Sequence, residues 1–213
     1  MQAVDRVIIS NNWMTLVFVV ALVLLFVLKI THQSKLIGFS KAFFVKGFIE
    51  KKAEEKETYF SLFNSFLFVF SAIVFSLLTL FVLNLVNTDY GFDFELFIRV
   101  LIGVISYLFL LDSITFLLSN LFHIRNEMGS LVIAKKTYLF NTAIWLFPFL
   151  IIAAYGFYNL FFILSVFVFL FGMSIVLIVF NNKNLILSKL FYFILYLCAL
   201  EIAPLLIIYK IMV

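Results

Sequence analysis

Charged residues are scarce in this sequence. Only 12% of its 213 residues are Asp, Glu, Lys or Arg, whereas 66% are hydrophobic. An ordinary soluble domain is about half apolar and about a quarter charged, so no aqueous fold could bury this much apolar surface. The composition therefore excludes a typical soluble domain and predicts one all-α membrane domain.

Cysteine and histidine are also nearly absent. The only cysteine, Cys198, cannot form an intrachain disulfide. The two histidines, His32 and His123, stand alone, whereas a metal site needs several ligands at workable spacing. We therefore expect neither a structural disulfide nor a bound metal.

Recognised catalytic motifs are missing as well. The sequence has no Walker loop, zinc-binding His-Glu-x-x-His, Gly-x-Ser-x-Gly elbow or dinucleotide fingerprint. A lipid-modifying enzyme would gather acids, histidines or arginines at one membrane face, but Asp89, Asp93 and Glu95 have only Arg99 beside them. We predict no catalytic residues and no cofactor.

Long apolar runs dominate what is present. Because about 20 apolar residues span the hydrocarbon layer, the sequence predicts a polytopic helical membrane protein with about six transmembrane helices. Their expected ranges are 12–30, 59–86, 96–122, 136–154, 157–181 and 187–211. Residues 137–180 contain no charge over about twice the length of a span, so we predict a tight turn at residues 155–159, where Gly156 suits a sharp bend.

The basic residues predict an orientation. Twelve of the fifteen Lys and Arg fall on one side, in the connections at 29–58, 125–136 and 183–189, and only Arg6, Arg99 and Lys210 fall on the other. The excess of Lys and Arg in cytoplasmic loops therefore places both termini in the periplasm of a bacterial inner membrane. Topology accounts for the net charge of +4, so no nucleic-acid partner is expected. Positive charge follows the first apolar run instead of preceding it, which indicates an uncleaved first helix.

The predicted cytoplasmic connection at residues 31–58 mixes lysines with phenylalanines. Its first part is compatible with a position along the leaflet, with lysines on anionic headgroups, although its apolar residues form no clean stripe. The charged run at 50–57 is interpreted as a solvated helical extension of the second span.

Two carboxylates, Asp112 and Glu201, fall within predicted spans. A charge at the bilayer centre costs at least about 2.5 kcal/mol, so both should face the bundle interior, a water-filled cavity or a partner. No Lys or Arg is expected near either acid in this chain. Each is then protonated, hydrogen-bonded or paired with a cation from another subunit, and a proton relay, a subunit contact and a structural role all stay open.

Several uncharged residues are also expected to matter. Pro204 should kink the last helix and free the Leu200 carbonyl beside Glu201, and Pro148 should do the same to Ile144. Asn141, like Asn64 and Asn120, is expected to form hydrogen bonds between helices. Gly103 and Gly172 are expected to mark close helix packing.

The C-terminal stretch carries a resemblance. Residues 195–206, Leu-Tyr-Leu-Cys-Ala-Leu-Glu-Ile-Ala-Pro-Leu-Leu, followed by Tyr209 and Lys210, resemble the Bacteroidota inner-membrane proteins grouped as domain of unknown function 4271. The length, span pattern and abundance of phenylalanine also fit. The resemblance implies a location in the membrane and no particular activity.

Together these features favour a non-enzymatic subunit or assembly partner of a larger envelope complex. Its expected partners are the lipid bilayer and other membrane proteins. The alternative is a small proton-coupled transporter or channel that uses Asp112 and Glu201, and a lipid-active enzyme is a third class. Intramembrane acids without cations in the same chain favour the first class over the others.

Overall fold

The computed structural model describes residues 12–43, 62–86, 93–121, 125–156 and 160–181. Every regular element in these ranges is an α-helix, and five of the helices are long and apolar enough to cross a membrane. The prediction of an all-α, helical membrane protein is confirmed. The expected sixth span at 187–211, with Glu201 and Pro204, lies outside the described residues, as do the charged run at 50–57 and both chain ends.

The five long helices follow the predicted spans closely. They are α1 (Asn12–Thr31), α4 (Leu62–Val86), α5 (Phe94–Leu121), α6 (Arg125–Tyr155) and α7 (Leu160–Asn181). In hydrocarbon every backbone N–H and C=O needs a partner within the protein, so an apolar run of this length folds as a helix. α6 begins eleven residues before the predicted start at residue 136, because hydropathy marks the apolar part of a helix and not its polar extension.

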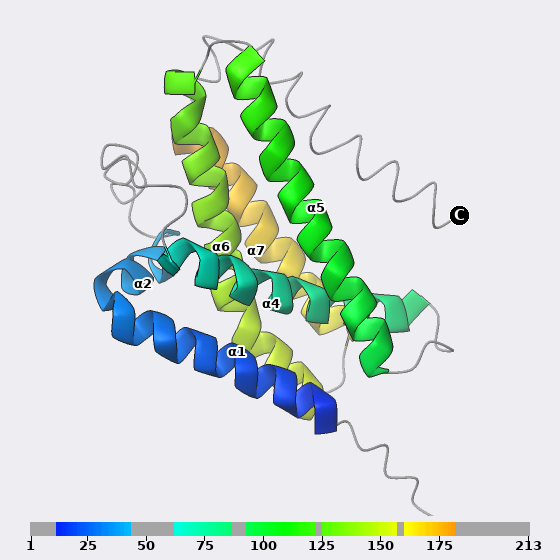
Figure 1. Cartoon of the computed structure of the whole chain (residues 1–213). Helices are drawn as coiled ribbons and strands as arrows, with labels where there is room; N and C mark the ends of the chain where they lie inside the picture. The colour runs from blue at the N-terminus through cyan, green and yellow to red at the C-terminus, as the bar shows by residue number, and fades with distance from the viewer. Residues whose placement is uncertain (1–11, 44–61, 87–92, 122–124, 157–159, 182–213) are drawn as a thin grey trace, which may run out of the picture.

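α5, α6 and α7 run alternately up and down, whereas α1 and α4 cross them at a slant (Figure 1). The start of α1 and the end of α6 meet at one end of the bundle. At this end the Tyr155 hydroxyl and the Thr15 hydroxyl lie 2.7 Å apart. α4 and α6 lie in the centre, with 61% and 56% of their apolar windows buried, whereas the corresponding value for α5 is 6%. α1, α5 and α7 therefore form the periphery.

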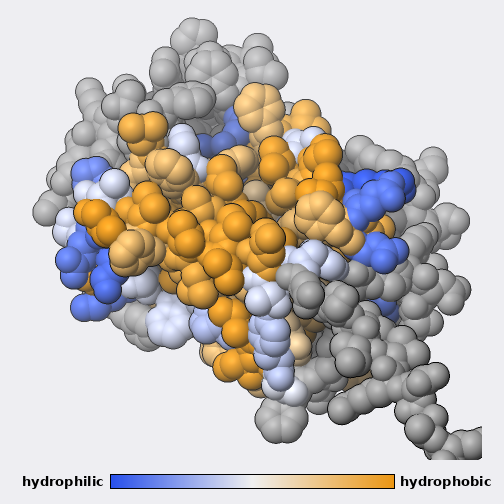
Figure 2. Space-filling model, turned by 60° about the horizontal axis from the view of Figure 1, so that its bottom comes forward, coloured by the Kyte–Doolittle hydropathy of each residue, from blue (hydrophilic) through white to orange (hydrophobic). Residues whose placement is uncertain are grey.

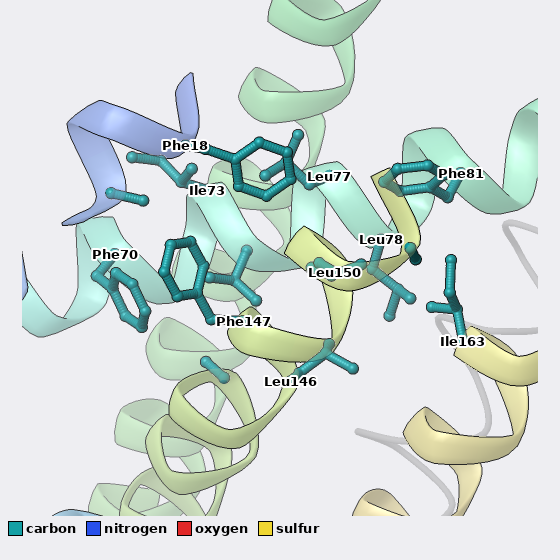
Figure 3. Packing of buried hydrophobic residues seen from close by; sticks show 14 of the residues in the cluster. Phe18, Phe70, Ile73, Leu77, Leu78, Phe81, Leu146, Phe147, Leu150 and Ile163 are labelled. Atoms are coloured by element: carbon teal, nitrogen blue, oxygen red, sulfur yellow. The ribbon is translucent and has the colours of Figure 1, made fainter. Parts of the chain in front are cut away.

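The core lies where α1, α4, α6 and α7 meet (Figure 3). Phe147 of α6 packs edge-on against Phe70 of α4, with ring centroids 5.4 Å apart, and tilts against Phe18 of α1 at 6.1 Å. Such aromatic pairs contribute about 0.5–1.5 kcal/mol beyond the area they bury. Outside this core, apolar side chains form a broad band with hydrophilic residues on either side of it (Figure 2).

The predicted break between the fourth and fifth spans is present, and residues 157–159 of the expected turn lie outside the described residues. α6 ends at Tyr155, Gly156 lies in a turn, and α7 begins at Leu160. A Cβ atom at Gly156 would lie 2.7 Å from the carbonyl oxygen of Ile152. Glycine is therefore required at this position by a close backbone approach.

Gly103 and Gly172, which are expected to mark close helix packing, do not pack closely on any described helix of this chain. A Cβ atom added at either residue would meet nothing within 4 Å. Both glycines lie on peripheral helices, α5 and α7. The sequence shows that these residues are small but does not show which face of a membrane helix points inward. Pro148 lies inside α6, and the helix continues on both sides of it.

Candidate functional site

A short helix, α2 (Gln33–Ser40), is the least expected element of the fold. It follows α1 after His32 and packs against α1 and α6. Phe39 anchors it, with 1% of its surface exposed, in a second apolar cluster that includes Leu28, Phe63 and Phe140. The imidazole ring of His32 lies edge-on to the ring of Phe63.

Two side chains of α6 hold the carboxyl end of α2. The Asn141 amide nitrogen donates to the Phe39 carbonyl at 2.6 Å, and the Trp145 indole N–H donates to the Ser40 carbonyl at 3.0 Å. The Phe39 carbonyl also accepts the Ala42 backbone N–H at 3.2 Å, so Asn141 adds a second hydrogen bond to it. Trp145 bonds the last carbonyl of α2, which has no partner within the helix itself. The prediction that Asn141 makes an interhelical hydrogen bond is confirmed, whereas the role of Trp145 had no signal in the sequence.

Asn141 itself is only partly satisfied. Its side-chain oxygen is buried and accepts no hydrogen bond from the described residues, and the hydroxyl of Thr137, one turn earlier on α6, is likewise buried without a described partner. Both residues are 0% exposed. The two polar atoms belong to the inward face of α6.

Asp112 has a cation partner within the same chain. The Lys136 ammonium of α6 lies 2.8 Å from the Asp112 carboxylate of α5. The expectation that no Lys or Arg of this chain reaches this acid is therefore wrong. Lys136 had been assigned to a connecting loop, but α5 and α6 are antiparallel, so the first turns of α6 lie beside the last turns of α5.

The Asp112–Lys136 pair lies far from the end of the bundle where α5 begins and α6 ends. Asp112 follows Phe94 by eighteen residues and Lys136 precedes Tyr155 by nineteen, which at about 1.5 Å per residue places both about 27–29 Å from the opposite end of the bundle. A hydrocarbon layer is about 30 Å thick. The side chains are 44% and 37% exposed, which fits a position at its edge.

Further polar contacts join α6 to α7. The hydroxyls of Thr142 and Ser174 lie 2.9 Å apart, and the Asn181 amide donates to the Tyr138 hydroxyl at 2.8 Å. The Thr142 and Ser174 hydroxyls also bond to carbonyls one turn earlier in their own helices. Sequence reasoning missed these four residues, because Ser, Thr and Tyr in an apolar helix give no indication of which neighbour they meet.

The described side chains do not form a cluster that resembles a metal site. In the described ranges no group of three or more His, Cys, Asp or Glu is placed to hold a metal ion. The expectations of no metal, no cofactor and no catalytic residue stay predictions, and the placement of Glu201 and Pro204 lies outside the described chain. The polar contacts described above join pairs of helices. These pairs are α2–α6, α5–α6, α6–α7 and α1–α6.

A family model described as a domain of unknown function (DUF4271) matches residues 14–212. The chain belongs to this family. The match begins within α1 and includes every later element described above, so the DUF4271 domain and the helical bundle coincide. No curated protein and no solved structure matches the chain. The family assignment confirms the resemblance of the C-terminal stretch and carries no activity with it.

Proposed function

We propose that this protein is a non-enzymatic subunit or assembly partner of a larger complex in the bacterial cytoplasmic membrane. The observation that carries the proposal is the exposure of α5. Only 6% of its apolar window is buried, although it is flanked in sequence by α4 and α6, which are the most buried helices. A span that the other described helices cover so little has a large face left for another membrane protein.

The exposed face of α5 has a regular pattern. Ile98, Ile102, Ile105 and Phe109 recur at spacings of three and four residues, with exposures of 36–65%. Gly103 and Ser106 are exposed beside this stripe. In membranes, helices associate by van der Waals packing, and small residues let two backbones approach closely. A partner helix packed along this stripe is therefore the contact we propose.

The described polar groups support the same class of function. Asn141, Thr142 and Tyr138 make hydrogen bonds between helices of this chain, and Asp112 is paired with Lys136 of the same chain. Asp112 therefore gives no evidence for a cation from another subunit. The proposal now depends on the α5 face and, for Glu201, on the unchanged expectation that an intramembrane acid avoids lipid.

Site-specific photo-crosslinking in native membranes tests the proposal. A photoreactive residue at Ile102 or Phe109 should give one discrete protein adduct, and one at Val168 or Phe169 of α7, which are equally exposed to the surroundings, should give none. Mass spectrometry of the adduct distinguishes a second copy from a different subunit. The proposal is wrong if α5 and α7 positions give the same result.

The rival function, proton-coupled transport, has its own test. Protein reconstituted in vesicles with a trapped pH-sensitive dye should show proton movement that Asp112→Asn or Glu201→Gln abolishes without loss of folding. A membrane subunit should show no such movement with either variant or with the wild type.

A further inference from the structure

The contact between the end of α2 and α6 encloses two buried oxygen atoms that need hydrogen-bond partners. Thr137 and Asn141 are both 0% exposed, and neither the Thr137 hydroxyl nor the Asn141 side-chain oxygen has a partner among the residues that the structure describes. We infer that one water molecule is bound between these two oxygens, where α2 meets α6. The inference is independent of the proposed protein partner, because it concerns the inside of the bundle and not the exposed face of α5.

Helical spacing brings the two oxygens to one place. Asn141 follows Thr137 by four residues within α6, so their Cβ atoms lie about 5–6 Å apart on the same face of the helix. Helical side chains lean toward the N-terminus of their helix, which directs Asn141 over the turn that carries Thr137. The two oxygens make no hydrogen bond to each other. Two O–H···O bonds of about 2.7–2.8 Å, joined at one water oxygen, bridge a gap of this size.

The orientation of the Asn141 amide is fixed by α2. Its nitrogen donates to the Phe39 carbonyl at 2.6 Å and lies 3.5 Å from the Ser40 carbonyl. An amide turned the other way would place its oxygen against these carbonyls, which accept hydrogen bonds and cannot donate them. The Asn141 oxygen therefore points away from the end of α2 and needs a donor from elsewhere.

Thr137 differs from the other buried hydroxyl residues of the described helices. The hydroxyls of Ser71, Ser76, Thr142 and Ser174 each donate to a carbonyl three or four residues earlier in their own helix. Such a bond is the local way to satisfy a hydroxyl within a helix. The Thr137 hydroxyl makes no such bond. Because a buried polar group without a partner is unfavourable, this hydroxyl needs a partner beside α6.

The chain at the end of α2 covers this part of α6. Phe39 is bonded to Asn141, and four residues later the ring of Phe43 stacks on the ring of Tyr138, the neighbour of Thr137, with centroids 6.0 Å apart. Residues 39–43 therefore run along α6 from Asn141 back toward Thr137. A molecule bound beneath them is enclosed, so it has to be small.

The two oxygens suit water better than a metal ion. Hard cations such as Ca²⁺ and Mg²⁺ take about six or more oxygen ligands. A buried water is held by about two to four polar groups that would otherwise be unsatisfied. Water can donate to the Asn141 oxygen and accept from the Thr137 hydroxyl at the same time, which satisfies both residues.

Proton-detected solid-state NMR of the full-length protein in deuterated lipid bilayers tests the inference. Magnetisation from water should reach the Asn141 side-chain amide, whose signal is assigned by its loss in Asn141→Leu. Thr137→Val removes one partner of the water and should abolish this transfer, whereas Thr137→Ser keeps the hydroxyl and should keep the transfer. Thr142→Val is the matched control, because the Thr142 hydroxyl is already bonded to the Tyr138 carbonyl, and it should also keep the transfer.

Three results would overturn the inference. They are no transfer from water to Asn141 in the wild type, full transfer in Thr137→Val, and equal loss in Thr137→Val and Thr142→Val. Ordering a water costs entropy that offsets its hydrogen bonds, so Thr137→Val should stay folded and its lost signal should report the water itself. A crystallographic or electron-microscopy map that resolves waters should show one within hydrogen-bond distance of both oxygens. A protein side chain in its place would assign the donor to the chain and contradict the bound water.

Discussion

At the scale of single residues, the Asp112–Lys136 pair is a half-exposed ion pair. Exposed pairs contribute about 0.2–1 kcal/mol. We expect Asp112→Asn to lower the free energy of unfolding by no more than about 1 kcal/mol, and the exchange Asp112→Lys with Lys136→Asp to restore most of the loss. Unfolding of the purified protein in mixed micelles measures both.

A much larger effect would place the pair elsewhere. A loss of about 3–5 kcal/mol is typical when one partner of a buried pair is removed. That result for Asp112→Asn would contradict a position at the edge of the hydrocarbon, and failure of the exchanged pair to recover stability would contradict the contact itself.

Asn141 and Thr137 form a matched pair of buried polar residues with opposite expected effects. Asn141→Leu removes one of the two hydrogen bonds to the Phe39 carbonyl, which keeps the Ala42 N–H, and the net loss of one hydrogen bond costs about 0.5–1.5 kcal/mol. Thr137→Val removes a hydroxyl that has no described partner, so we expect little change or a small gain in stability. The same unfolding measurement compares them, and equal losses in the two variants would refute the proposed cap on α2.

At the scale of elements, the α6–α7 hairpin depends on Gly156. Gly156→Ala would bring Cβ to 2.7 Å from a backbone carbonyl, so we expect a loss of more than about 1 kcal/mol. Gly103→Ala and Gly172→Ala serve as controls, because both sites are open and alanine favours a helix by about 0.5–1 kcal/mol over glycine. Thermal unfolding of the isolated protein should therefore rank Gly156→Ala below the wild type and both controls at or above it. A neutral Gly156→Ala variant would show that the turn has room for a side chain.

The short helix α2 shows where element-level reasoning fails. Its eight residues are too few for a clear apolar period, and its lysines favoured a position along the leaflet. Its place is decided by donors on α6, a hundred residues later in the chain, and by burial of Phe39. Contacts of such long range cannot be inferred from the local sequence.

At the scale of the whole molecule, the orientation in the membrane is a prediction from the distribution of Lys and Arg. In a Cys198→Ser background, a membrane-impermeant thiol reagent applied from the periplasmic side should label a cysteine at Asp93 and leave one at Lys52 unlabelled. After the membrane is opened, both positions should react, which controls for accessibility. Labelling of Lys52 alone from outside would invert the topology.

The sequence by itself determined the class of the protein and most of its helices. Apolar runs the length of a bilayer predicted five described helices to within a few residues at most ends, and the break near Gly156 was visible because a charge-free run of double length must turn. These features are local, and the bilayer imposes them: a segment without charge has to cross it, and its backbone has to form a helix.

Only the tertiary structure decided which faces of these helices meet. Nearly uniform apolar composition hides the buried side of a membrane helix, so the central positions of α4 and α6, the open sites of Gly103 and Gly172, and the hydroxyl contacts of α7 had no local signal. The Asp112–Lys136 pair depends on the antiparallel alignment of α5 and α6, and the cap on α2 depends on its return toward α6. In each case the partner is selected by packing between distant segments, because lipid and protein interior are equally apolar and only shape and a few polar contacts distinguish them.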